Sequence, residues 1–147
     1  MIKIQFFEMI PEDTLHVARS VFHDGNAYIH MRDKLPSVLM KQDSLDRYVW
    51  ISATDWRLVI INAMQQIERL TDPQTANAIR GRIDWKYACG LSLADPGFPA
   101  TTFQQFRVRL KNSPEMLGLL NLIMDEIKEY EETNGFIYTS PYDLYIR

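Results

Sequence analysis

Three histidines recur every seven residues, which is about two helical turns and would suit a metal site: His16, His23 and His30. The pair Gly25-Asn26 predicts the end of a helix before His30, so the three imidazoles need not share one face. Zinc requires three or four converging ligands with supporting hydrogen-bond partners. We therefore interpret the histidines as surface or capping residues and predict no metal site.

The residues needed for covalent or two-metal catalysis are also missing from the pattern. Cys89 shares a predicted helix with Trp85 and is interpreted as a small buried hydrophobe, because no base or oxyanion hole is indicated for it. A group of carboxylates lies close together on one helix, whereas a two-metal site needs carboxylates from separate elements; the group is Asp125, Glu126, Glu129, Glu131 and Glu132. No glycine-rich phosphate loop, HExxH, GxSxG or CxxC pattern occurs. We expect no enzymatic activity, no cofactor and no small-molecule substrate.

Basic and amide side chains concentrate in the middle of the chain. Residues 56–111 contain eight basic and four acidic residues, whereas residues 112–147 contain two and seven. Glutamine and arginine can hydrogen-bond to adenine and guanine edges, and lysine and arginine neutralise phosphates. The sequence therefore predicts a DNA-binding set, with Gln104, Gln105 and Arg109 near bases and Arg80, Arg82, Lys86 and Lys111 near phosphates.

Three short, tightly joined helices are predicted to position this set. The first covers 73–80, with Asp72 as N-cap, Pro73 at N1 and Gly81 in the left-handed position after its end. The second covers 83–89 and ends at Gly90, and the third covers 102–111 with Thr101 or Thr102 as its cap. Such a succession is typical of a helix-turn-helix-like trihelical unit. In the third helix an inward apolar stripe turns the glutamines outward, and it consists of Phe103, Phe106 and Leu110.

The remaining segments complete an all-α domain. Helices are predicted over 12–22, over 56–70 with Thr54 or Asp55 as cap, and from Ser113-Pro114 to about residue 132. Residues 31–50 predict two short helices split near Pro36, residues 94–99 a loop, and IKIQF (2–6) and FIY (136–138) a short terminal β pairing. The predicted core contains Trp56, Ile60, Met64, Ile67, Ile79, Trp85, Phe103, Phe106, Leu110, Leu120 and Ile123.

Length and composition agree with a single globular domain. The chain has 147 residues, 46% of them hydrophobic, and a net charge of −3. One cysteine excludes a disulfide framework and fits a reducing cytosol. No apolar run approaches the length of a transmembrane helix, and the N-terminus lacks the features of a signal peptide. A cytoplasmic protein is expected, associated with the nucleoid if it binds DNA.

The strings in the middle of the chain resemble a known family. LTDPQTANAIRGRIDWKYACGLSLADPGF, residues 70–98, is followed by FQQFRVRL, residues 103–110. This succession resembles the N-terminal domain of bacterial insertion-sequence transposases of the InsH-like type, with its W-R-L helix start, R-I-D-W-K-Y-A string, D-P-G-F loop and F-R-x-R-L ending. The resemblance extends over residues 10–125 and implies an all-helical domain that recognises transposon-end DNA and assists dimerisation.

The sequence also departs from this family pattern. The family's RNase H-like domain uses three separated acidic residues to hold two magnesium ions, and the tail EYEETNGFIYTSPYDLYIR does not resemble the connection into such a domain. We therefore expect the catalytic carboxylate domain, and with it phosphoryl transfer, to be absent. Pro73 stands where the family usually has an arginine, which would remove one phosphate contact. We predict a helical transposase N-terminal-like domain over 1–132 and a divergent tail over 133–147.

Two functions remain open on this basis. The first is a DNA-binding module, a truncated or domesticated transposase fragment that binds double-stranded DNA at transposon ends or regulates transposition, with a homodimer or full-length transposase as further partners. Helix 102–111 would read the bases, or else helix 73–80 or 83–89 would occupy the groove. The second is a protein-interaction module that keeps the fold without binding DNA, since the acidic C-terminal residues repel phosphates.

Overall fold

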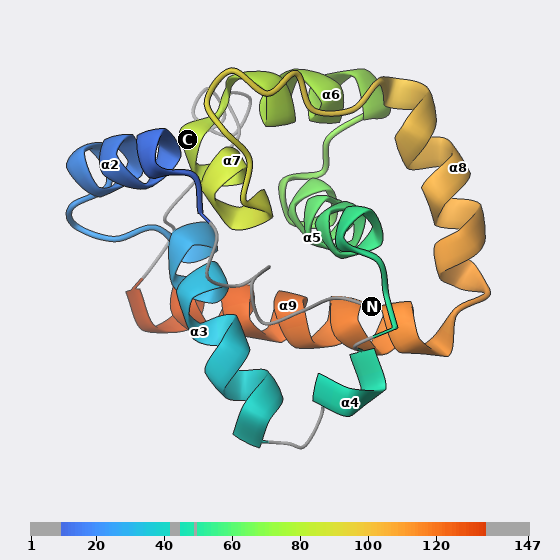
Figure 1. Ribbon diagram of the computed structural model, residues 1–147. Helices are drawn as coiled ribbons and strands as arrows, with labels where there is room; N and C mark the ends of the chain where they lie inside the picture. The colour runs from blue at the N-terminus through green and yellow to red at the C-terminus, as the bar shows by residue number, and fades with distance from the viewer. Residues whose placement is uncertain (1–9, 42–44, 49, 135–147) are drawn as a thin grey trace.

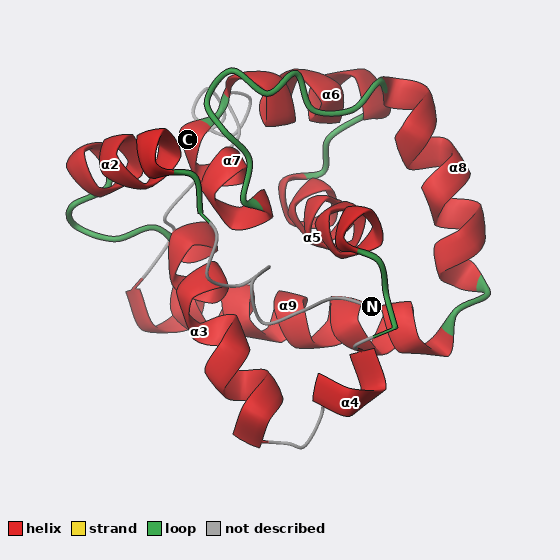
Figure 2. Ribbon diagram, viewed as in Figure 1, coloured by secondary structure: helices red, strands yellow, loops and turns green. Residues whose placement is uncertain are grey.

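The computed structural model describes residues 10–41, 45–48 and 50–134. The strands predicted at 2–6 and 136–138 lie outside these residues, as does most of the predicted tail. Over the described residues the chain forms helices and no strand, which confirms the all-α fold class (Figures 1 and 2). The helices are α2 (Glu12–Val21), α3 (Ala27–Lys41), α4 (Leu45–Tyr48), α5 (Ala53–Glu68), α6 (Asp72–Gly81), α7 (Ile83–Cys89), α8 (Ala100–Lys111) and α9 (Pro114–Asn134).

Helix α5 is the centre of the domain. Its sequence is apolar on nearly every side, and such a helix is stable only when neighbours surround it. Helices α6, α7, α8 and α9 all pack against it, and Figure 1 shows α6 above, α8 to the right and α9 below. The Ser52 side chain caps the helix by accepting a hydrogen bond from the Asp55 backbone N–H at 3.1 Å. The cap predicted at Thr54 or Asp55 was therefore wrong, and the helix begins earlier than expected.

The predicted core is confirmed with one adjustment. All its members are buried except Ile67, which is partly buried and packs against the others. The amphipathic pattern underestimated α5, because Leu58, Val59 and Ile61, which lie off the predicted stripe, are also buried. An apolar residue off the main stripe becomes core when a helix is surrounded.

Two further helix starts differ from their predictions. Thr71, not Asp72, is the N-cap of α6, because its hydroxyl accepts from the Gln74 N–H while the Gln74 side chain accepts from the Thr71 N–H. This reciprocal capping box satisfies two N–H groups at once. Helix α8 begins at Ala100 after Pro99, which leaves both predicted threonine caps inside the helix.

Two helix ends or breaks also need correction. Gly81 is the last residue of α6 and has no left-handed backbone, so Arg82 follows in an extended conformation. Helix α3 continues through Pro36, where a break was predicted. Proline removes one helical hydrogen bond, but the fully buried Leu35 and Leu39 anchor the helix on both sides of it. Gly90 is left-handed at the end of α7, as predicted.

The three helices of the predicted trihelical unit do not pack as a separate bundle. Helix α6 contacts both α7 and α8, but α7 and α8 lie on opposite sides of α5 (Figure 1). Helix α7 instead packs against α2, α3 and α5, and α8 packs against α5 and α9. The two segments that were expected to contact DNA therefore lie in different environments.

Candidate nucleic-acid interface

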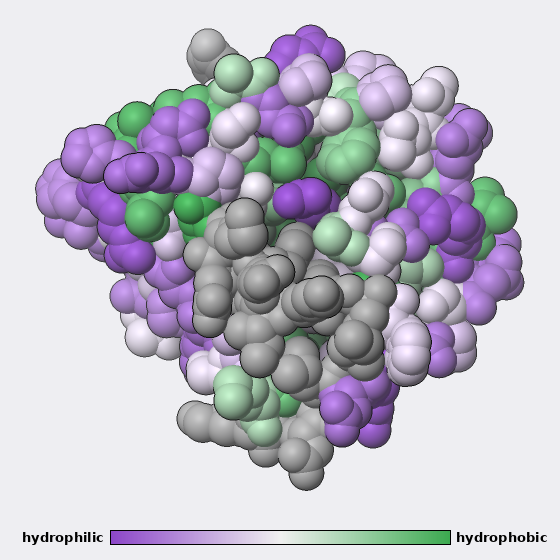
Figure 3. Space-filling view, in the orientation of Figure 1, coloured by the Kyte–Doolittle hydropathy of each residue, from purple (hydrophilic) through white to green (hydrophobic). Residues whose placement is uncertain are grey.

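Helix α8 presents one apolar and one polar face. Phe103, Phe106 and Leu110 are buried, which confirms the predicted inward stripe. The opposite face exposes Gln104, Gln105 and Lys111. The surface over α8, at the right of Figure 3, is mostly hydrophilic. These three residues belong to the predicted DNA-binding set, and the fold turns them toward solvent.

Arg107 fixes α8 to the start of α6. Its guanidinium donates to both Asp72 carboxylate oxygens, each at 2.7 Å, and Asp72 also accepts from the Gln65 amide at 2.8 Å. The hydrogen bonds from Arg107 hold the pKa of Asp72 below its ordinary value, although partial burial opposes them. Bidentate pairs of this kind set both the position and the orientation of their partners.

Arg109 fixes the other flank of α8. Its Nη1 donates to both oxygens of Asp55 in the first turn of α5, each at 3.0 Å, and its guanidinium lies 5.3 Å from the Phe106 ring centroid. Its side chain is nevertheless 53% exposed. The predicted base contact is therefore engaged in a solvent-exposed ion pair, of the kind that contributes about 0–1 kcal/mol to stability.

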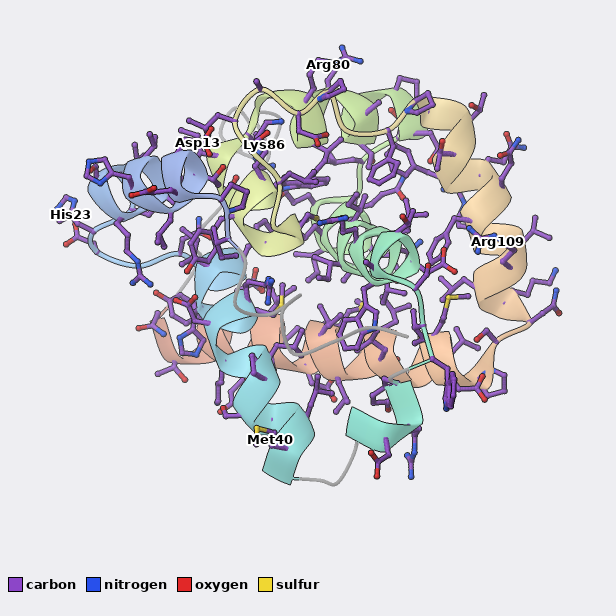
Figure 4. All side chains as sticks on the ribbon, in the orientation of Figure 1. Asp13, His23, Met40, Arg80, Lys86 and Arg109 are labelled. Atoms are coloured by element: carbon purple, nitrogen blue, oxygen red, sulfur yellow. The ribbon has the colours of Figure 1, made fainter. Side chains whose placement is uncertain are left out.

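Arg80 and Lys111 are exposed cations at two helix ends. Arg80 extends away from the body of the protein at the end of α6 (Figure 4), with a long 3.4 Å contact to Asn77. Lys111 lies in the last turn of α8. Both side chains are accessible to a large anionic ligand.

Arg82 lies in a largely buried polar network, and the structure does not present it as a phosphate contact. It donates to Glu68 at 2.6 Å and to Asp84 at 2.9 and 3.2 Å. Burial lowers the pKa of its guanidinium, but the charge of Asp84 and the hydrogen bond to Glu68 outweigh burial, and the pKa rises. The guanidinium also covers the Trp85 ring at 5.2 Å.

The two carboxylates of this network have further donors. Glu68 accepts from the Tyr28 hydroxyl at 2.6 Å and from the Trp85 indole N–H at 3.2 Å. Asp84 accepts from the Trp85 backbone N–H at 3.0 Å and from the Asn26 amide at 3.4 Å. Buried charges are tolerated only with such partners. The network joins α3, α5 and α7.

Lys86 is likewise buried, with 2% of its surface exposed. Its ammonium donates to the Asp95 backbone oxygen in the loop before α8, and burial lowers its pKa. Asp95 shapes the same loop by accepting from the Gly97 N–H at 2.8 Å. Gly97 has φ +75°, and a Cβ there would lie 2.6 Å from Ile79. The prediction that Lys86 contacts a phosphate therefore conflicts with the structure, in which its buried ammonium is hydrogen-bonded within the protein.

The burial of α7 explains why the sequence misplaced Arg82 and Lys86. A seven-residue helix offers little exposed face when α2, α3, α5 and α6 surround it. Every residue from Asp84 to Cys89 is buried, and burial raises the pKa of the Cys89 thiol to about 12, as expected for a buried hydrophobe. The apolar residues Trp85, Ala88 and Cys89 in so short a helix were the one sequence pattern that indicated burial of Lys86 and partial burial of Arg82.

Metal and membrane features are absent from the described part of the chain. No group of three or more histidine, cysteine, aspartate or glutamate side chains among the described residues is placed to hold a metal ion. His23 contacts its neighbour Asp24, and His30 stacks with Tyr130 at 4.7 Å. None of the described helices is long and apolar enough to cross a bilayer.

A comparison with protein families finds a match for the middle of this all-helical domain. Residues 53–109, which span α5, α6, α7 and most of α8, match the family model described as Transposase domain (DUF772). This segment is similar to that transposase domain, which confirms the predicted resemblance. The match associates residues 53–109 with transposition. No curated protein and no solved structure matches the chain.

Proposed function

We propose that the protein is a DNA-binding module of transposase origin, which contacts duplex DNA through the outer face of α8. The observation that carries the proposal is the mounting of this helix. The bidentate pair of Arg107 with Asp72 anchors one flank of α8 to α6, while Gln104, Gln105 and Lys111 point outward. A rigid helix with exposed amides and a cation suits major-groove recognition.

The contact set in this proposal is narrower than the one predicted from the sequence. Gln104 and Gln105 would contact base edges, and Lys111 and Arg80 would contact phosphates. Arg109 would join only by exchanging Asp55 for a DNA acceptor. Arg82 and Lys86 are left out, and α7 is not a groove-binding helix in this fold because nearly all of it is buried.

We further propose that this domain itself acts by binding, and that it occupies transposon-end DNA or pairs with full-length transposase. The one acidic residue of the RIDWKYA segment, Asp84, supports this because it is paired with Arg82. Magnesium-dependent nicking by the pure protein, abolished by a single carboxylate substitution, would contradict it.

The test is a duplex titration of the full chain at several salt concentrations. Lys111→Ala should weaken binding to all sequences and reduce the log–log salt slope by roughly 1. Gln105→Ala should cost about 1–3 kcal/mol on a preferred site and relax specificity at one position. Asn112→Ala, an exposed neutral change after α8, is the matched control.

Binding that stays at the non-specific level at low salt would reject the proposal. The protein-interaction module would then be the better function, and the exposed acidic side chains Asp125, Glu129 and Glu132 on α9 would favour a basic protein partner. Specificity changes on substitution of Arg80, with none at Gln104 or Gln105, would instead transfer the reading role to α6.

A further inference from the structure

Arg69 has a backbone conformation that arginine rarely adopts. It ends α5 with φ 57° and ψ 49°, and it is the one described non-glycine residue with positive φ. Its backbone N–H bonds to the Gln66 carbonyl at 3.3 Å, and the Leu70 N–H bonds to the Gln65 carbonyl at 3.1 Å, which completes a left-handed helix cap. Glycine is the usual residue at such a position. The backbone conformation therefore does not favour arginine at this position. The Arg69 side chain is exposed to solvent.

The Arg69 side chain borders an open groove beside α8. The groove has a volume of about 480 Å³, and its wall is formed by the end of α5, the start of α6 and one side chain of α8. The polar side chains that line it include Asn62, Gln65, Gln66, Arg69, Thr71 and Arg107. The Gln66 amide donates to Asn62 at 2.6 Å, so these amides are held in place.

The charge balance of the groove favours an anion. Asp72 is the one carboxylate in its lining, and the bidentate Arg107 neutralises it. Arg69 then leaves a net positive charge. Glu68, the neighbouring carboxylate, is 3% exposed and is directed into the buried network with Arg82. The carboxyl end of α5 disfavours an anion, but the amino end of α6 starts at the same groove and offsets it.

The groove is continuous with the proposed DNA-binding face. Gln104 precedes Arg107 by three residues and Lys111 follows it by four, so all three lie along one side of α8. A duplex seated on the outer face of α8 would carry its backbone past this side and over the groove.

We propose that Arg69 binds a backbone phosphodiester of duplex DNA in this groove, beside Arg107. The inference rests on the proposed function of α8 and adds a contact that neither the sequence pattern nor the family comparison assigns. Arg107 keeps its tie to Asp72 and positions the groove, while Arg69 supplies the charge that the phosphate neutralises.

The left-handed backbone provides a test that separates binding from folding. Arg69→Gly removes the guanidinium and places the residue best suited to positive φ, so its melting temperature should equal or exceed that of the wild type. Arg69→Asn, which also tolerates this conformation, is the second neutral variant, and Arg69→Lys keeps the charge. Arg47→Ala, an exposed arginine on α4, is the matched control.

Affinity for a mixed-sequence duplex of about 30 base pairs is measured with the full chain across salt concentrations. Loss of one phosphate contact should lower affinity roughly tenfold near 50 mM salt and reduce the salt slope by about 1. We expect this for Arg69→Gly and Arg69→Asn, but not for Arg69→Lys or Arg47→Ala. At constant ionic strength, replacing part of the salt with inorganic phosphate should not reduce duplex binding further, because a single ion lacks the α8 contacts.

The outcomes distinguish this inference from the function on which it rests. Wild-type binding with an unchanged slope in Arg69→Gly overturns the phosphate contact and leaves the role of α8 intact. An equal loss in Arg47→Ala also overturns it, because the effect would then follow net charge. Absence of duplex binding by the wild type rejects the proposed function itself.

Discussion

The α7 and α8 regions carry similar numbers of cationic side chains but use them in different ways. Around α7, Arg82 and Lys86 are drawn into the interior, where Glu68, Asp84 and the Asp95 carbonyl accept their hydrogen bonds. On α8, Arg107 and Arg109 make surface ion pairs that hold the helix, and Lys111 stays exposed. The most distinctive string of the chain, RIDWKYA, therefore places its charged side chains in the interior. The less distinctive FQQFRVRL is the one that exposes polar side chains to solvent.

Substitution of Trp85 should have the largest effect on stability. Its side chain is fully buried and its indole N–H bonds to Glu68, so Trp85→Ala should cost about 3–5 kcal/mol in the free energy of unfolding. Denaturant titration measures this loss. Trp50→Ala is the matched control, because Trp50 is 79% exposed and should change stability by about 0.5 kcal/mol or less. A loss below roughly 1 kcal/mol for Trp85→Ala would contradict the conclusion that α7 contributes its side chains to the core.

The second-largest effect on stability is expected from neutralising Glu68 in the buried network around Arg82. Glu68→Gln keeps the size of the side chain but leaves Arg82, Tyr28 and Trp85 with one neutral acceptor in place of a carboxylate. Hydrogen bonds to charged groups contribute about 1.5–3 kcal/mol, and we expect a loss in that range. Glu115→Gln in the exposed first turn of α9 is the control. Equal stability of the two variants would mean that the buried charge is dispensable.

The tie between α6 and α8 should have a smaller effect that depends on pH. Asp72→Asn should cost about 1 kcal/mol at neutral pH, as expected for a partly exposed ion pair. The folded protein lowers the pKa of Asp72 through the Arg107 hydrogen bonds, so the contribution is complete above the unfolded value of about 3.9 and is lost as pH falls through the lower folded pKa.

Thermal unfolding of the wild type and Asp72→Asn between neutral and acidic pH measures this dependence. The difference between the two proteins should be constant at neutral pH and shrink below about pH 4. Asp125→Asn on the exposed side of α9 should show no such change. A difference that grows on acidification would contradict the assignment of the lowered pKa to the Arg107 pair.

The smallest effect on stability is expected at Arg109. A double-mutant cycle with Asp55→Ala and Arg109→Ala should give a coupling energy of about 0–1 kcal/mol, because the pair is exposed and screened. Under the proposed function, a weak coupling would allow Arg109 to exchange Asp55 for a DNA acceptor. Coupling above about 2 kcal/mol would mean that Arg109 is a structural residue like Arg82 and Lys86. It would then not be available for the proposed DNA contact.

Local patterns were sufficient for most of the helices and for the core. The apolar spacing in 56–70, the Pro73 start and the Gly90 end each depend on neighbours in the chain, so the elements could be read directly. The caps were harder, because Ser52, Thr71 and Pro99 compete with adjacent polar residues that are equally good candidates. The continuity of α3 through Pro36 depended on packing at Leu35 and Leu39, which no local pattern contains.

Sequence patterns alone were sufficient to predict three features. These are the all-α fold, the similarity to a transposase domain that the match over 53–109 confirms, and the outward position of Gln104 and Gln105 on α8. Only the tertiary structure decided which cations remain accessible, because a lysine or arginine has the same local signature whether its partner is water or a distant carboxylate. Lys86 meets the Asp95 carbonyl and Arg82 meets Glu68 only after the chain has folded around α5. The left-handed backbone of Arg69 is likewise set by the junction of α5 and α6, since side-chain spacing carries no information on φ.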